Sequence, residues 1–331
     1  MEFWTAAELT KTRAVPHALA LGYAEFVDRA CRAEEMGFDG FAPMEHHFTY
    51  DSFCPAPLLA DAAVVLGTKR IKLLTGAMLL PLHDPLRVAE DVATLDRISG
   101  GRVNVVLGMG YRPLEFDGLS SNKRTRGARL VEMIQFLQQV LSNDHVSFHG
   151  KYYQYDDITI RPRPVQRPYP LLWVGGGPTV KAAQRAGRAG LPYVLANSPF
   201  EHAEECVQAY RAAGRDAGFS LQVLKEAVVK DMCLARNVDE AKGLRDVLLH
   251  RFYDEHILGY GYLVDEDGNH LYNCLHSHPL YQRHVNSIFV GTPEMAIREL
   301  QRYEGLGIEI MEILTGQMDL FAKEVMPAFR R

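Results

Sequence analysis

The stretch Leu73–Phe116, LLTGAMLLPLHDPLRVAEDVATLDRISGGRVNVVLGMGYRPLEF, decides the fold class of this chain. Near its two ends lie short apolar runs rich in β-branched residues, 70–76 and 102–108, which predict strands. Between them, Asp84 before a proline predicts the start of a helix, and Gly100 predicts its end. A strand, a helix and a second strand in this order form a unit whose two strands run in parallel.

The same alternation of strand and helix continues along most of the chain. For example, leucine and isoleucine recur at a spacing of three to four residues over 130–141, which predicts a helix that buries one stripe. Eight such units favour an α/β fold of the (β/α)8 TIM barrel type, with an open doubly wound sheet as the competing architecture. No Pro/Ser/Gly-rich linker divides the chain, so residues 1–331 are interpreted as one domain. The predicted strands are 2–6, 38–44, 70–76, 102–108, 170–175, 192–196, 226–235 and 308–314.

The composition excludes several classes of partner. Hydrophobic residues make up 47% and charged residues 23% of the 331 residues, which is ordinary for a globular protein with a full core. The net charge of −5 comes without a basic stripe, so nucleic acid is not an expected partner. No apolar run approaches the roughly 18 residues that span a bilayer, and the first residues do not read as a signal peptide. Five scattered cysteines predict reduced thiols in a cytoplasmic protein.

Two segments do not fit the minimal barrel unit. Residues 145–162 predict an inserted hairpin. Residues 255–292 form a long connection between two predicted helices, and structureless connections beyond about 12–15 residues are usually functional or mobile. Because this connection is rich in Gly, Tyr, His and Asn, we interpret it as a lid over the barrel mouth. The alternative is a plain surface loop.

Chemistry on a barrel gathers where the strands end, and the second predicted strand ends in Glu45-His46-His47. Side chains alternate across a strand, so only one of the two histidines can face the mouth. An imidazole there can act as a general acid or base, whereas the structural alternative is a ring bonded to Glu45. Zinc sites on barrel strands need two histidines with one residue between them, so that both side chains point inward. His46 and His47 have the wrong parity for this, and His276 and His278, which have that spacing, lie in the segment interpreted as a lid, so no metal is expected.

A glycine run before Pro178 predicts a binding site for an anion. Gly175 to Gly177 leave backbone amides bare ahead of a helix start, which suits a phosphate, although a tight strand-to-helix turn would have the same sequence. Arg126 could supply a guanidinium to the same phosphate, or it could be solvated surface. Neither GGGPTV nor GMGYRP matches G-x-G-x-x-G, so no nicotinamide-binding fold is indicated.

Taken in order, these pieces resemble the bacterial luciferase-like flavin-dependent monooxygenases. The resemblance covers nearly the whole chain, and its central run, 73–116, is highly specific. The other matching stretches are EHHF (45–48), RGARLVEMI (126–134), PLLWVGGG (170–177), VGTPEMAI (290–297) and EVMPAFR (324–330).

The resemblance implies a (β/α)8 barrel that holds reduced FMN (FMNH2), supplied by a separate flavin reductase. O2 would add to the flavin to give a C4a-hydroperoxide, which would oxygenate a small organic substrate. Two alternatives stay open. One is a deazaflavin-dependent oxidoreductase on the same barrel, and the other is a catalytically silent flavin-binding subunit that serves an active homologue.

The resemblance also assigns roles to residues. His46 matches the family's catalytic base, with Glu45 as its support, and Gly76-Ala77 falls where the family places a non-prolyl cis peptide against the flavin ring. Luciferase catalytic subunits carry Cys-Arg at Gly108-Met109, so neither light emission nor a long-chain aldehyde substrate is expected. The implied cofactor-binding residues are Thr75, Gly76, Ala77, Gly108, Met109, Gly110, Tyr111, Arg126, Val174, Gly175, Gly176, Gly177 and Thr179.

Two further expectations concern the substrate and assembly. The pocket wall is expected to be apolar or aromatic, which suggests an apolar or aromatic substrate. In the predicted helix 56–67, small residues share one face, and the resemblance implies a homodimer through this region; the alternative is packing against the barrel wall. The expected wall residues are Met44, Phe48, Met78 and Tyr111, and the small residues are Ala60, Ala63 and Gly67.

Overall fold

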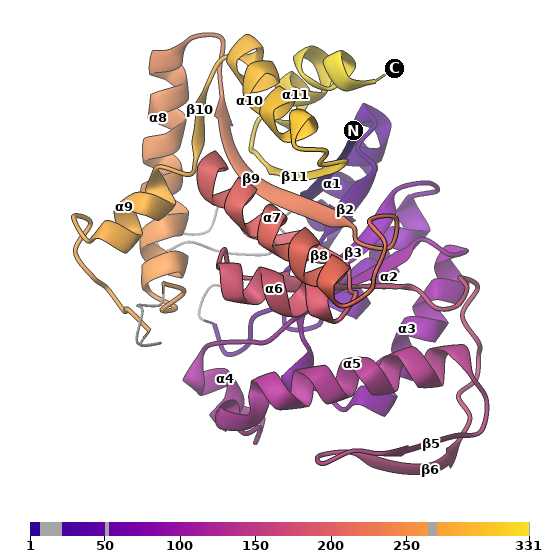
Figure 1. Cartoon of the computed structure of the whole chain (residues 1–331). Helices are drawn as coiled ribbons and strands as arrows, with labels where there is room; N and C mark the ends of the chain where they lie inside the picture. The colour runs from indigo at the N-terminus through magenta and orange to yellow at the C-terminus, as the bar shows by residue number, and fades with distance from the viewer. Residues whose placement is uncertain (7–21, 50–52, 264–269, 331) are drawn as a thin grey trace.

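The structure is a computed structural model that describes residues 1–6, 22–49, 53–263 and 270–330 (Figure 1). Within these residues, eight parallel strands close into a barrel, which confirms the predicted fold class. Closure occurs at β1 (Glu2–Ala6), which pairs in parallel with β2 (Gly40–Ala42) on one side and with β11 (Ile310–Leu314) on the other. The other barrel strands are β3 (Lys72–Leu79), β4 (Val103–Gly108), β7 (Leu171–Gly176), β8 (Tyr193–Leu195) and β9 (Glu226–Leu234).

The strands bury both of their faces, as expected for a parallel barrel. Alternate residues fill the interior, where the Trp4 and Trp173 rings meet edge to face with centroids 5.3 Å apart. The outward residues join a larger core beneath the helices. The interior cluster consists of Trp4, Ala42, Leu74, Val106, Trp173, Val194, Ala227 and Ile310.

The helix inside the deciding stretch forms as its sequence predicts. Helix α3 (Pro85–Ser99) begins after Asp84, whose carboxylate accepts a hydrogen bond from the backbone N–H of Arg87 at 3.0 Å. It ends at Gly100, which adopts the left-handed conformation with φ 68°. The other helices that cover the barrel are α1 (Tyr23–Met36), α2 (Pro57–Gly67), α5 (Arg126–Ser142), α6 (Val180–Arg188), α7 (Phe200–Asp216), α10 (Pro293–Gly305) and α11 (Met318–Glu324).

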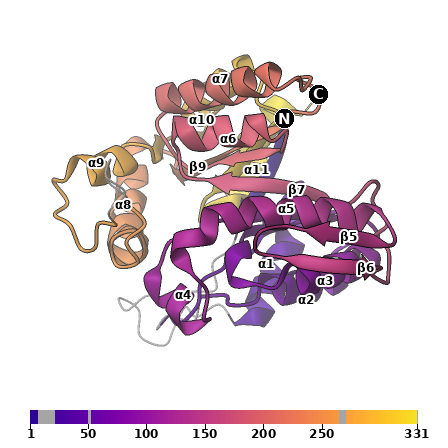
Figure 2. The same ribbon diagram turned by 60° about the horizontal axis from the view of Figure 1, so that its bottom comes forward.

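The predicted hairpin segment contains β5 (Val146–His149) and β6 (Gln154–Ile158), which pair antiparallel beside α5 (Figure 2). Glu132 of α5 fixes the hairpin turn, because its carboxylate accepts the backbone N–H groups of residues 151–153. A short helix, α4 (Pro113–Gly118), precedes α5 and lies after the end of β4. None of the helices in the described ranges is long and apolar enough to cross a membrane.

Residues 255–292 are more ordered than expected for a structureless connection. Helix α8 (Val238–Leu248) runs on as a π-helix, Leu249–Leu258, and α9 (Pro279–Val285) and β10 (Phe289–Gly291) follow. Helices α8 and α9 project to one side of the barrel in both views (Figures 1 and 2). Strand β10 pairs in parallel with the C-terminal end of β9. The segment has its own apolar cluster around Tyr253, Leu263 and Tyr281, which explains its order. Residues 264–269 of the expected lid lie outside the described residues.

Replacing Trp173 by alanine should destabilise the barrel strongly. The side chain is 1% exposed and packs on Trp4, so its loss leaves a large cavity, and the free energy of unfolding should fall by about 3–5 kcal/mol. Urea unfolding followed by circular dichroism measures this change. Leu221→Ala is the control, because Leu221 is 52% exposed and its truncation should change the unfolding free energy by less than about 0.5 kcal/mol. Equal effects of the two variants would contradict the assignment of Trp173 to the core.

Candidate active site

His46 lies just past the end of β2, at the rim where the strands finish. Its ring is 14% exposed and is surrounded by aromatic rings, with the Phe53 centroid 4.8 Å and the Tyr260 centroid 5.2 Å from its own. Nδ1 of His46 lies 2.8 Å from Oε1 of Glu115, and Nε2 faces the Tyr111 hydroxyl at 3.4 Å. Because the ionised Glu115 can only accept, Nδ1 carries the proton and Nε2 is the nitrogen left for chemistry at the mouth.

Glu115, and not Glu45, supports His46, so that part of the expectation is wrong. Glu115 lies in α4 and is fully buried; its Oε1 also accepts from the backbone N–H of His47 at 3.1 Å and from Arg112 at 3.1 Å. Burial alone would raise the pKa of Glu115, but the hydrogen bond from His46 and these neighbours outweigh burial and lower it. The sequence carried a signal for this residue, since Pro113 predicts a helix start whose first turn would hold Glu115 at the rim.

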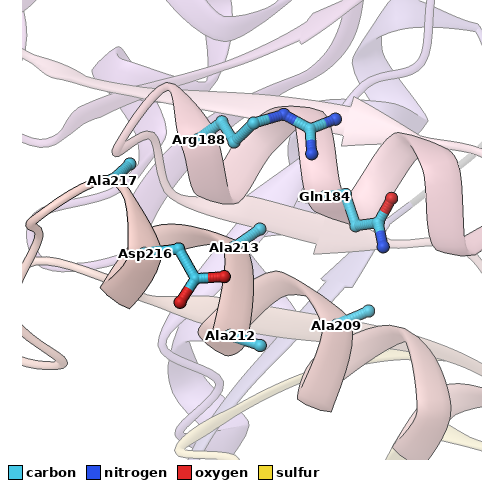
Figure 3. A pocket seen from close by; sticks show the side chains of 7 residues that line it. All are labelled: Gln184, Arg188, Ala209, Ala212, Ala213, Asp216 and Ala217. Atoms are coloured by element: carbon cyan, nitrogen blue, oxygen red, sulfur yellow. The ribbon is translucent and has the colours of Figure 1, made fainter.

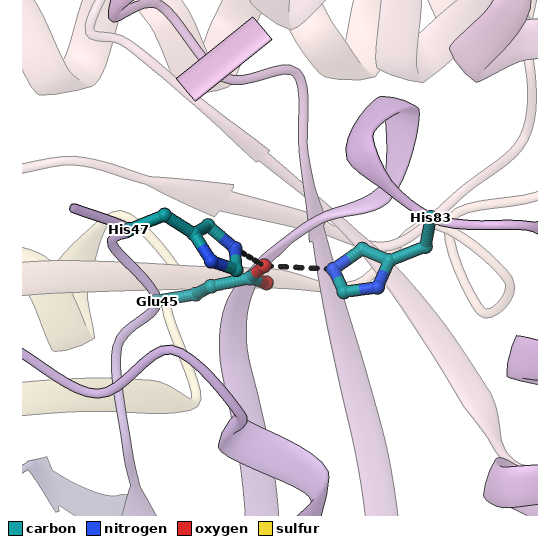
Figure 4. A group of neighbouring side chains, drawn as sticks. All are labelled: Glu45, His47 and His83. Carbon is teal, nitrogen blue, oxygen red and sulfur yellow. Dashed lines mark hydrogen bonds and ion pairs between the residues drawn. The ribbon is translucent and has the colours of Figure 1, made fainter. Parts of the chain in front are cut away.

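Glu45 binds the other histidine, His47, together with His83 from the end of β3 (Figure 4). Both imidazoles donate from Nε2 to Oε1 of Glu45 at 2.7 Å, and the backbone N–H of Leu79 donates to Oε2 at 2.7 Å. Burial would raise the pKa of Glu45, but these donors outweigh it and lower the pKa. The two adjacent histidines therefore bond two different carboxylates, although both lie in the irregular backbone after β2 rather than in the strand itself.

Glu45, His47 and His83 form a group that could ligate a metal ion, although the sequence predicted no metal site. The three ligand atoms lie within 4.8 Å of one another and are chemically able to hold a metal ion. Each N–O separation of 2.7 Å is also a normal hydrogen-bond length, so the carboxylate is fully satisfied without an ion. The sequence argument weighed His46 with His47 and His276 with His278, and it missed His83 because that residue follows another strand.

Aromatic side chains from the expected lid close over His46. Besides Tyr260, the Tyr262 ring lies 5.7 Å and the His270 ring 5.9 Å from that of Tyr111, measured between centroids. The guanidinium of Arg112 stacks over Tyr260 at 4.1 Å. Burial, with the nearby charges of Lys123 and Arg126, lowers the pKa of His270. The described part of residues 255–292 therefore contacts the residues around His46.

Small residues form the rim beside these rings. The peptide bond Gly76-Ala77 is cis, as the family resemblance implied. A Cβ at Gly108 would lie 3.0 Å from the Cβ of Ala77, and a Cβ at Gly175 would lie 3.4 Å from the same atom. Gly108, Gly175 and Ala77 are thus brought together by β3, β4 and β7, and glycine is what allows the close approach.

The predicted phosphate residues lie at and beyond the end of β7 and at the start of α5, which follows the neighbouring strand β4. A Cβ at Gly177 would meet nothing within 4 Å, so the backbone there faces open space. Thr179 caps α6 by accepting from the backbone N–H of Ala182 at 3.2 Å. Arg126 begins α5, and its Nε is buried without a hydrogen-bond partner among the described residues. A buried unpaired donor and a bare glycine turn fit an anion such as phosphate.

The remaining predicted cofactor residues are distributed around this rim. Val174 and Gly176 lie in β7, where they pair with β8. Met109 and Gly110 follow β4; the Met109 sulfur lies near Gly127 of α5, and Gly110 has φ 71°. The Thr75 side chain points away from the mouth, because its hydroxyl donates to Asp61 of α2 at 2.7 Å.

Two of the residues predicted to line the pocket wall, Met78 and Phe48, lie elsewhere, so this part of the prediction is wrong. Met78 is 2% exposed and lines a groove between α2 and α3 on the outside of the barrel. Phe48 is 53% exposed, and its ring covers Gly118 at the end of α4. Both lie near sequence that faces the mouth, but the irregular backbone after β2 and the register shift in β3 between Gly76 and Met78 redirect them. Tyr111 lies beside His46 as expected.

A separate hollow of about 280 Å³ lies between α6 and α7, away from His46 (Figure 3). Gln184 and Arg188 of α6 face Ala213 and Asp216 of α7 across it. Its lining is mostly alanine with one pair of opposite charges, and we assign it no part in the site.

A family model described as luciferase-like monooxygenase matches residues 3–309, so the chain belongs to the luciferase-like monooxygenase family. The expected family and class of enzyme are confirmed. The FMNH(2)-dependent dimethylsulfone monooxygenase of Pseudomonas putida is 26% identical over 288 residues, which cover 81% of this chain and 77% of that protein.

Another relative carries a different cofactor in its name. The F420-dependent glucose-6-phosphate dehydrogenase of Amycolatopsis mediterranei (strain U-32) is 34% identical over 178 residues, 51% of this chain and 52% of that protein. Among solved structures, monooxygenase RslO1 from Streptomyces bottropensis matches with a TM-score of 0.82 at 24% identity over 100% of both chains, a likeness of fold. The chain spans about half the length of several other curated relatives that it matches.

Replacing Glu115 by glutamine should weaken the fold at neutral pH. The pKa of Glu115 is lowered, so the stabilisation from its ionised form is full above the unfolded value of about 4.5 and is lost as the pH falls through the folded value. Loss of the charged acceptor should cost about 1.5–3 kcal/mol at pH 7, and less at pH 4. Urea unfolding at the two pH values measures this difference. Glu304→Gln, on the exposed face of α10, is the control; a Glu115→Gln effect that is the same at both pH values would contradict the role of the charge.

Proposed function

We propose that this protein is the oxygenase component of a two-component FMN-dependent monooxygenase. The observation that carries the proposal is the His46 imidazole, held by buried Glu115 at a glycine-rich rim and covered by tyrosines of the 255–292 segment. When bound, reduced FMN would supply the electrons that activate O2. The FMN-dependent relative from Pseudomonas putida supports this choice of cofactor.

In this proposal the chain's own residues do three things. His46 accepts or returns a proton at Nε2, while Glu115 holds Nδ1–H and stabilises the charged ring. The turn at Gly175–Gly177, with Thr179 and Arg126, binds the phosphate of the cofactor. Tyr260 and Tyr262 keep water away from the reacting atoms, which matters because oxygen activated on a flavin is lost to water in an open site.

The proposal includes partners outside this chain. A separate flavin reductase would supply the reduced FMN, O2 would be the co-substrate, and a small apolar or aromatic molecule would be the organic substrate. We also propose that residues 1–331 form one cytoplasmic domain, because strands from both ends of the chain pair and all five cysteines are free thiols.

A deazaflavin-dependent oxidoreductase is the second candidate, favoured by the F420-dependent relative from Amycolatopsis mediterranei. It would use the same barrel for hydride transfer and would not need O2. A silent flavin-binding subunit is disfavoured by the His46 and Glu115 pair, which such a subunit would have no reason to keep. If His46→Ala left turnover unchanged, the catalytic assignment of His46 would be withdrawn.

Anaerobic titration of the protein with reduced FMN, reduced riboflavin and reduced F420 separates these candidates. Reduced FMN should bind at least about tenfold more tightly than reduced riboflavin, because only FMN carries the phosphate. Arg126→Ala should remove most of that difference, whereas Arg124→Ala, an exposed neighbour, should leave it intact. Admitting O2 should then oxidise the bound FMNH2. Tighter binding of F420 than of FMN, with no reaction with O2, would overturn the proposal in favour of the second candidate.

We further propose that the protein is a homodimer formed through α2 and α3. Of the small residues expected on the contact face, Ala60 is buried and Gly67 lies against Cys31 of α1, so we place the contact on the neighbouring apolar residues of the two helices. The outer surface instead carries an apolar groove of about 500 Å³ between the two helices, with Leu59 73% and Ile98 55% exposed. Exposed apolar patches of this kind mark interaction surfaces.

Light scattering on the purified protein tests the dimer. The parent protein should have twice the chain mass of 37.2 kDa. The double variant Leu59→Glu, Ile98→Glu should have the mass of one chain, because two charges would be buried in the interface. Leu221→Glu, exposed at another site, should stay dimeric. A parent protein with the mass of one chain would refute the proposal.

A further inference from the structure

The mouth of the barrel has two halves of opposite charge. On the side of β4 and β7, Arg126 is the first residue of α5 and Lys123 lies just before it, near the proposed phosphate site. On the opposite side, β9 and β11 pair in parallel and carry two acids, Asp231 and Glu312. The basic half is accounted for by the cofactor, whereas the proposed reaction assigns nothing to the acidic half.

Glu312 faces the interior of the barrel. It lies two residues beyond Ile310, an interior residue of the same strand, and its backbone pairs with Trp4 of β1 and with Val229 of β9. Among the described residues no hydrogen bond or ion pair to its carboxyl group is found. Burial, with a contribution from the Asp231 carboxylate, raises the pKa of Glu312 to about 7. A carboxyl group in such a place costs folding free energy, and natural proteins keep one where function needs it.

Asp231 is held beside Glu312 by a network of donors. It accepts hydrogen bonds from the Tyr253 hydroxyl and from Nδ2 of Asn197, the latter at 2.8 Å. Asn197 Oδ1 and the Ser198 hydroxyl, both deeply buried, have no hydrogen-bond partner among the described residues. The ends of β8, β9 and β11 therefore present acceptors without a donor, namely Asn197 Oδ1 and the Glu312 carboxyl group, and these fit a ligand that brings donors of its own.

Aromatic rings connect this acidic half to His46. Burial, with the charge of Asp231 nearby, raises the pKa of Tyr262 to about 12. The Tyr262 ring lies 5.7 Å from that of Tyr111, and the Tyr111 hydroxyl reaches His46. Carboxylates at one end and tyrosine rings along the wall are the groups that recognise an organic cation, through ion pairing and cation–π contact.

We infer that the substrate carries a positively charged amino group, which Glu312 binds at the end of β11 while the rest of the molecule lies along Tyr262 and Tyr111 toward His46. This inference rests on the proposed function, and it narrows an apolar or aromatic substrate to one with a cationic end. Substrates with a carboxylate or sulfonate at that end would be excluded, because they would meet Asp231 and Glu312.

Calorimetric titration with benzylamine and benzyl alcohol tests the inference at pH 8, in the presence and absence of saturating oxidised FMN. The two probes share a ring, and only benzylamine is a cation at this pH. Benzylamine should bind the parent protein roughly tenfold more tightly than benzyl alcohol, the usual value of a hydrogen bond to a buried charged group. Glu312→Gln should abolish the preference and leave the alcohol within about twofold of the parent. Glu312→Asp, which keeps the charge, should retain part of the preference.

Glu309→Gln is the matched control, because Glu309 lies three residues earlier in the chain and is exposed. The inference is overturned if the parent binds both probes equally, if Glu312→Gln keeps the preference for the amine, or if Glu309→Gln loses as much. Each variant is first checked for parental thermal unfolding. These titrations involve no reduced flavin and no O2, so a protein that fails the cofactor test can still pass this one, and the reverse.

Discussion

The parallel pairing of β1 with β11 joins the two ends of the chain, with Glu2 opposite Ile310 and Trp4 opposite Glu312. Once the cylinder is closed, the carboxyl ends of its strands share one rim, whatever their distance in sequence. This closure brings His46, which follows β2, to Glu115 beyond the end of β4, and it sets the His46 ring against Tyr260, which follows α8 in the chain. The site is a consequence of topology first and of individual residues second.

The rim also explains how one short run of sequence serves two networks. His46 and His47 are neighbours, yet each bonds a different buried carboxylate, Glu115 or Glu45. Each carboxylate keeps its charge because several donors surround it, which opposes the cost of burial. One imidazole is thereby left facing the mouth, while its neighbour ties the loop to the end of β3.

The parts of this structure that the sequence could predict are those with local causes. The strand positions follow from periodicity, and the capped ends of α3 follow from Asp84 and Gly100. The placement of His46 at the rim follows from its position directly after the second strand. The carboxylate partner of His46 could not be predicted in the same way, because Glu45 and Glu115 are both near the rim and the choice depends on three-dimensional packing. The order within residues 255–292 was missed for a related reason, since its apolar residues are spaced irregularly and cluster only after folding.

The position of His83 has a consequence beyond its hydrogen bond. Its ring lines the outer groove between α2 and α3, and it also shares an oxygen of Glu45 with His47, the residue next to His46. In the proposed dimer, a second subunit in that groove would contact His83 at one end of this hydrogen-bonded chain. A ligand in the barrel mouth would contact His46 at the other end. By thermodynamic reciprocity, whatever association does to affinity at the mouth, occupancy of the mouth must do to association in equal measure.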